Sequence, residues 1–132
     1  MPVGALRRFL DRLRGPIRRF LDRLVQTDED RLAEELREWA GTIPGTVRIA
    51  EVPNRQRVKL AGMVRRITVR PGEGFDSLEA LLSDGTAEVT AVWAGRRSIP
   101  GLSLGTRMIL EGTLGEDRAG KRVVNPRFEF AP

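Results

Sequence analysis

Residues 81–95 read LLSDGTAEVTAVWAG, and this stretch predicts a β-hairpin. The dipeptide Asp84-Gly85 is a strong two-residue turn signal, because such turns need positive φ angles that Asp and Gly tolerate. Apolar residues alternate with other residues on both sides of the turn: Leu78, Ala80 and Leu82, then Val89, Ala91 and Trp93. Alternation of this kind is typical of strands with one buried face. The hairpin is therefore expected to bury one face and to expose the other.

Three further strands are predicted around this hairpin. A long strand alternates from Val58 to Val69, and its Gly62 is typical of a bend where a sheet curls into a barrel. The alternation changes phase at Arg65-Arg66, which predicts a β-bulge. Met108, Leu110 and Gly112 indicate a fourth strand, and residues 94–105 before it form a short turn across the barrel floor. A fifth strand, 123–130, is interrupted at Asn125-Pro126, and the proline favours an edge position.

Five short strands with a glycine bend in the first predict an all-β core, a five-stranded Greek-key barrel of the OB-fold type, with an N-terminal α-helical extension. Four segments carry a family resemblance: VKLAGMVRRITV (58–69), LLSDGTAEVTAVW (81–93), GTRMILEGTL (105–114) and VVNPRFEF (123–130). They resemble the OB domains of the tRNA-anticodon-binding-like type. The whole chain is similar to the small stand-alone OB-fold nucleic-acid-binding proteins of actinobacteria. The resemblance implies an OB-fold domain over residues 47–132 that binds nucleic acid.

Residues 1–25 form a basic amphipathic arm with seven arginines against two aspartates. The motif RRFLDRL occurs at 7–13 and again at 18–24, and an offset of 11 residues returns a helix to nearly the same face. Gly15-Pro16 between the copies should start a new helix or kink the old one. The apolar stripe of the arm needs a covering surface. We expect the barrel or a second copy of the chain to provide it, ahead of an anionic lipid surface or nucleic acid.

Residues 26–46 are predicted to form an acidic helix and a linker. Thr27 followed by Asp30 is an acidic variant of the capping box that begins a helix, and Gly41 is a plausible end. A narrow apolar face could dock on the barrel: Leu32, Leu36, Trp39 and Ala40.

The composition favours polyanionic partners and excludes several kinds of chemistry. The 132 residues contain 23 Lys and Arg against 18 Asp and Glu, and neither Cys nor His is present. Disulfides, thiol catalysis, Cys/His zinc sites and Ser-His-Asp triads are therefore excluded. The carboxylates are scattered, so we expect a non-enzymatic protein without a metal or cofactor. No apolar run approaches the roughly 20 residues of a membrane-spanning helix, and we expect a cytoplasmic protein.

OB barrels commonly bind single strands or structured RNA on an exposed face framed by two loops. We expect the barrel to gather these candidate residues on that face: Arg65, Arg66, Arg70, Phe75, Arg96, Arg97, Arg118, Lys121 and Arg122. Phe75 is the best candidate for stacking on a base, with Trp93 second if it lies at the barrel rim. Few aromatic residues are available, so weak, salt-sensitive binding of single-stranded DNA or RNA, tRNA included, is expected. The alternative is a protein–protein adaptor whose arm serves oligomerisation or attachment to a membrane surface.

Overall fold

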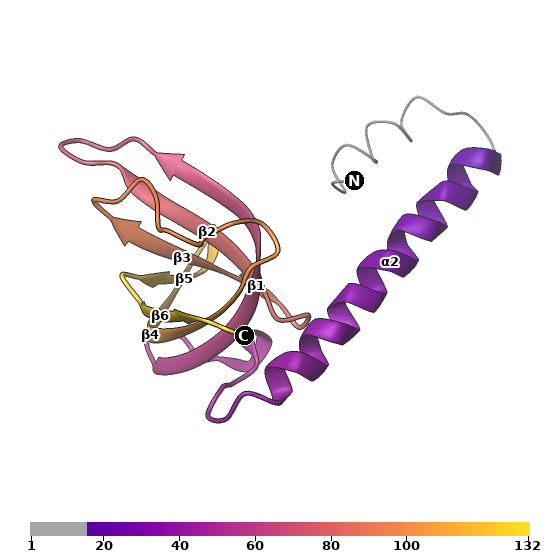
Figure 1. The fold of residues 1–132 in the computed structure, drawn as a ribbon, viewed down its shortest axis with the longest axis horizontal. Coiled ribbons are helices and arrows are strands. Elements are labelled where there is room, and N and C mark those ends of the chain that lie inside the picture. The colour runs from indigo at the N-terminus through magenta and orange to yellow at the C-terminus, as the bar shows by residue number, and fades with distance from the viewer. Residues whose placement is uncertain (1–15) are drawn as a thin grey trace.

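The computed structural model describes residues 16–132, which form one long helix and a sheet rolled into a barrel (Figure 1). The first RRFLDRL copy, at 7–13, lies outside the described residues. The strands are β1 (Arg57–Arg70), β2 (Ser77–Ser83), β3 (Glu88–Ala94), β4 (Arg107–Asp117), β5 (Gly120–Val124) and β6 (Arg127–Phe130). A short 3-10 helix, η1 (Ile49–Glu51), precedes β1, and the helix α2 (Pro16–Gly41) precedes both.

The strands close into a ring. Their order is β1-β2-β3-β5-β4-β6, and β1 also pairs with β4, which joins the two ends of the five-stranded part. Among the described strands, β3 and β5 form the parallel pair and the other pairs are antiparallel. The predicted barrel with a helical extension is confirmed. The predicted fifth strand is divided at Asn125-Pro126 into β5 and β6, and Asn125 has a φ of +50°.

Strand β1 is long because it belongs to both sides of the barrel. Its first half pairs with β4 and its second half pairs with β2, and Met63 has a partner on each side. Gly62 lies beside this changeover, where a Cβ would come within 3.0 Å of the Cβ of Leu82. The predicted bend therefore lies where the two sides of the barrel approach closely. The register with β2 shifts between Val64 and Arg66, which confirms the predicted bulge.

The barrel core is built from the inward face of β1 to β5. Trp93 is part of it and is only 4% exposed. Its Nε1 donates a hydrogen bond to the carbonyl of Pro126 at 3.4 Å, and its ring meets Phe128 edge-on at 5.5 Å. Trp93 therefore does not lie at the rim and is not available to stack on a base. Ile99 of the connector and Ile49 of η1 close the ends of the same core.

Helix α2 runs from Pro16 to Gly41 without a break at the predicted boundary between residues 25 and 26. Proline is favourable in the first turn of a helix, because the backbone N–H that it lacks would have no intrahelical partner there. Thr27 lies inside the helix, where its Oγ1 donates to the carbonyl of Arg23 at 2.9 Å. The prediction that a helix begins at Thr27 is therefore wrong, since the polar side chain bonds within an existing helix instead of capping a new one. The predicted end at Gly41 is confirmed.

Only the C-terminal half of α2 docks on the barrel (Figure 1). Ala40 packs against Ala61 and Ile109, and the guanidinium of Arg107 lies 4.9 Å from the centre of the Trp39 ring. The N-terminal half extends away from the barrel and leaves three large apolar side chains exposed: Ile17 (63%), Phe20 (62%) and Leu24 (47%). Within the described residues, no helix has both the length and the apolar character to cross a membrane.

Candidate nucleic-acid interface

A hollow of about 110 Å³ lies on the outer face of β1, β2, β3 and β5. The strand register builds it, because every second side chain of a strand points to the same face of the sheet. One row of aligned residues crosses all four strands: Arg66, Leu81, Thr90 and Arg122. We call this hollow the groove, and it is lined by Arg66, Thr68, Arg70, Glu79, Leu81, Thr90, Ala119 and Arg122.

Glu79 holds two of the groove arginines in place. Its Oε2 lies 2.8 Å from Nε of Arg70 and 3.3 Å from a terminal nitrogen of Arg122. Glu79 itself is only 8% exposed, whereas the side chain of Arg70 is 66% exposed. A guanidinium carries five N–H donors, so both arginines keep donors that can reach a phosphate. The ion pairs therefore orient the two guanidinium groups and leave some of their N–H donors available to a ligand.

Arg66 completes the basic lining of the groove. It lies on β1, as Arg70 does. It is exposed, and it forms no ion pair with any residue from 16 to 132. A solvated guanidinium of this kind can bind a phosphate without first breaking a protein contact. The groove thus combines two oriented cations with one unrestrained cation.

The loop between β1 and β2 lies at the Arg70 end of the groove, and the segment after β3 is tied to it. A terminal nitrogen of Arg97 donates to Oδ2 of Asp76 at 2.9 Å, and the backbone nitrogen of Gly95 donates to the carbonyl of Asp76 at 2.8 Å. Phe75, in the same loop, is 56% exposed. Arg96 is also exposed. The structure therefore brings Phe75, Arg96 and Arg97 together at one end of the barrel.

Arg118 lies at another border of the groove. It is exposed in the tight turn between β4 and β5, and the next residue, Ala119, lines the groove. Both loops that were expected to frame the binding face thus border the groove.

Two predicted site residues lie outside the groove. Arg65 lines a separate hollow under α2, together with Ser83 and Glu88 of the hairpin. Lys121 is adjacent to Arg122 on β5 and so faces the opposite side, where its Nζ donates to the carbonyl of Ile49. The expected grouping is therefore incorrect for Lys121, which faces the other side of the sheet, and Arg65 lies in a different hollow from Arg66.

Five groove residues are absent from the sequence-based candidates: Thr68, Glu79, Leu81, Thr90 and Ala119. The alternation of inward and outward side chains along each strand could have identified the first four, which lie on strands. In the sequence, Thr68 is two residues from Arg66, and Glu79 alternates with the core residues Leu78 and Ala80.

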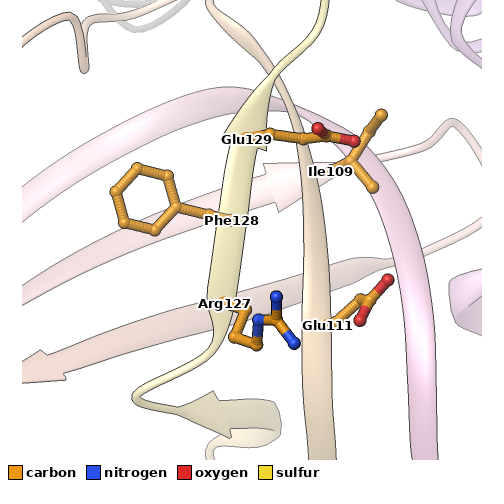
Figure 2. Close-up of a pocket in the computed structure, with 5 residues that line it drawn as sticks. All are labelled: Ile109, Glu111, Arg127, Phe128 and Glu129. Atoms are coloured by element: carbon orange, nitrogen blue, oxygen red, sulfur yellow. The ribbon is translucent and has the colours of Figure 1, made fainter.

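A second hollow, of about 140 Å³, lies on β4 and β6 (Figure 2). Figure 2 shows Phe128 on the opposite side of β6 from Glu129 and Ile109. This hollow is lined by two carboxylates, Glu111 and Glu129, and by one arginine, Arg127. The groove has the reverse balance, with three arginines and one carboxylate. Of the two hollows, the groove is the better match to a polyanion. Among residues 16–132, no three carboxylates converge in a way that could hold a metal ion.

Comparison with known proteins confirms the architecture. No protein-family model and no curated protein sequence matches the chain. Among solved structures, the chain is similar to RecG bound to a three-way DNA junction, with 18% identity and a TM-score of 0.55. The domain has an OB-fold. The OB domain of MM0293 from Methanosarcina mazei is similar at 22% identity and a TM-score of 0.51, and so is an OBody bound to hen egg-white lysozyme, at 17% and 0.51.

The similarity covers the barrel. The aligned part is 66%, 65% and 68% of this chain for RecG, MM0293 and the OBody, respectively. It covers 12% of the RecG chain, 82% of the MM0293 domain and 94% of the OBody. The OB-fold chain therefore corresponds to a small part of the RecG chain, and to most of the MM0293 OB domain and of the OBody.

Proposed function

We propose that this OB-fold binds single-stranded nucleic acid in the groove, without catalysis and with little sequence preference. The observation that carries the proposal is the convergence of Arg66 and Arg70 of β1 with Arg122 of β5 around one hollow. Phosphate contacts of this type supply affinity but carry no base information. The RecG structure, which is bound to DNA, is an OB-fold relative that supports the proposal.

The dimensions of the groove suit a strand that crosses the sheet. Arg66 and Arg122 are separated by three strand-to-strand spacings, or about 14 Å. Phe75 at the Arg70 end offers an exposed ring on which a base can stack. The ligand class comprises single-stranded DNA or RNA and structured RNA such as tRNA. The same proposal places the chain among the stand-alone, tRNA-anticodon-binding-like OB proteins of actinobacteria, acting in the cytoplasm.

The experiment is fluorescence-anisotropy titration of the full chain with labelled single-stranded DNA, single-stranded RNA, duplex DNA and tRNA across a salt series. Three phosphate contacts predict that log K falls against log salt with a slope of about −2, since each single-strand contact contributes about −0.7. The single strands are expected to bind more tightly than the duplex. Absence of binding to all four probes at low salt would contradict the proposal.

A second candidate function is that of an adaptor that associates through α2. The observation in its favour is the exposed apolar stripe of Ile17, Phe20 and Leu24 on the half of the helix that extends from the barrel. Replacing all three with Gln should convert a self-associated chain to a monomer in sedimentation equilibrium. A wild-type chain that is monomeric at all concentrations, and that does not co-sediment with anionic vesicles, would remove self-association and membrane attachment from consideration.

A further inference from the structure

The groove contains hydrogen-bonding atoms that the protein does not use. Both arginines bind Oε2 of Glu79, and no residue of the described chain bonds to its Oε1. The hydroxyls of Thr68 and Thr90 also have no partner within residues 16–132. In this part of the chain, every buried side-chain nitrogen or oxygen has a partner. The three unused groups are therefore not fully buried, and the residues that carry them line the groove.

An acceptor at the centre of a basic groove restricts which part of a nucleic acid can lie over it. A phosphate has only acceptor oxygens and a negative charge, so it is repelled by a carboxylate oxygen. The donors that a strand offers are the N–H groups of its bases and, in RNA, the ribose 2′-hydroxyl. A strand whose phosphates contact the surrounding arginines must therefore place a base or a sugar over Glu79.

The surroundings of Glu79 favour a base. Leu81 is two residues further along β2 on the same face and offers an apolar surface to a ring. Thr68 pairs with Glu79 across the sheet and Thr90 pairs with Leu81, and both hydroxyls can donate to ring acceptors. Cytosine presents an exocyclic amino group beside an acceptor nitrogen, whereas thymine presents a carbonyl oxygen at the position of that amino group.

We propose that Glu79 is a specificity-determining residue, whose Oε1 accepts a hydrogen bond from the exocyclic amino group of a base in the groove. This inference rests on the proposed function. Among pyrimidines this contact selects cytosine over thymine. Thymine has a carbonyl oxygen at the position of the cytosine amino group, so two hydrogen-bond acceptors, that oxygen and Oε1 of Glu79, would face each other. The weak base preference of the groove is thus concentrated at one position.

The test compares two labelled oligonucleotides of about 12 nucleotides, oligo(dC) and oligo(dT), on the full chain at mildly alkaline pH. The wild type should bind oligo(dC) about tenfold more tightly, a typical discrimination for one base-edge contact. Glu79→Gln keeps the shape of the side chain but can present either an oxygen or an NH₂ group. It should bind oligo(dT) more tightly than the wild type does, so that the two affinities become nearly equal.

The control variant is Glu129→Gln, which removes one negative charge at the hollow on β6 (Figure 2). It should change both affinities by the same factor and keep the preference.

Equal wild-type affinities for oligo(dC) and oligo(dT), or a preference that survives in a folded Glu79→Gln variant, would overturn the inference while leaving the proposed function intact. Oligo(U) bound more tightly than oligo(dT), with the difference lost in Glu79→Gln, would assign the ribose hydroxyl as the donor and overturn the choice of the amino group. Binding of none of these strands would refute the proposed function itself.

Discussion

Asp84 in the β2–β3 turn accepts a hydrogen bond from the backbone nitrogen of Ile49, with a distance of 2.9 Å to its Oδ2. Its Oδ1 accepts three more, from the backbone nitrogen of Thr86 at 2.9 Å, from the Thr86 hydroxyl at 2.6 Å and from the backbone nitrogen of Ala87 at 3.3 Å. Asp84 is only 2% exposed. The residue that signals the hairpin in the sequence thus also joins that hairpin to the segment before β1.

Replacing Asp84 with Ala should destabilise the fold strongly. The change leaves the buried N–H of Ile49 without a partner, and such a loss costs about 1–3 kcal/mol. Asp84→Asn should cost less, because one side-chain oxygen remains as an acceptor. Urea unfolding followed by circular dichroism measures both. A cost near zero for Asp84→Ala would show that the residue only favours the turn.

Gly85 is expected to tolerate no side chain, for two separable reasons. Its φ is +84°, and a Cβ would lie 2.0 Å from the carbonyl oxygen of Ala33 in α2. Gly74 has a similar φ of +89° with nothing within 4 Å, so Gly74→Ala measures the backbone strain alone, about 1–2 kcal/mol. Gly85→Ala should cost more than this control and should shift Trp39 fluorescence as α2 is displaced. Equal costs would mean that the helix accommodates the methyl group without strain.

Arg66 and its neighbour Arg65 form a matched pair for testing the groove. Arg66 lines the groove, whereas Arg65 faces α2. Arg66→Ala should weaken single-strand binding and reduce the magnitude of the salt slope by about 0.7, the value of one lost phosphate contact. Arg65→Ala removes the same charge and should leave the slope nearly unchanged. The reverse order of effects would move the binding surface to the α2 side of the barrel.

Phe75 should contribute to binding but little to stability, because its side chain is 56% exposed. Phe75→Ala should cost about 1–3 kcal/mol of binding free energy if one base stacks on the ring. Leu104→Ala is the control, since Leu104 is 66% exposed in the connector before β4. Anisotropy titration and thermal unfolding together separate the two effects. Unchanged affinity in Phe75→Ala would exclude stacking at this loop.

Several features of the fold could be predicted because their signals are local. The alternation around Asp84-Gly85 identified the hairpin, and the change of phase at Arg65-Arg66 identified the bulge. Proline at position 16 indicated a helix start, and α2 begins there, but a second start was wrongly assigned at Thr27, because Thr followed by acidic residues matches a cap equally well inside a helix. The role of Ile49 was also missed, since a three-residue 3-10 helix has no periodicity that could reveal its buried face.

The candidate site could be predicted only in part. The sequence identified Arg66, Arg70 and Arg122 as basic residues of the barrel, but it also assigned Arg65 and Lys121 to the same face. Arg65 was assigned to the groove because the sequence does not reveal that α2 packs beside it and forms a separate hollow there. The contacts of Glu79 with Arg70 and Arg122 join three strands and could not be inferred from spacing.

The sequence by itself determined that the chain forms a barrel, because alternation, turn dipeptides and a strand glycine act over a few residues at a time. Only the tertiary structure decided which side chains share the groove and that a carboxylate lies among its arginines. The physical reason is that these neighbours are set by strand register. Arg70, Glu79 and Arg122 meet only after β1 to β5 have paired around the ring. The tertiary structure likewise decided that α2 covers the hairpin turn with its acidic half and leaves Ile17, Phe20 and Leu24 in solvent.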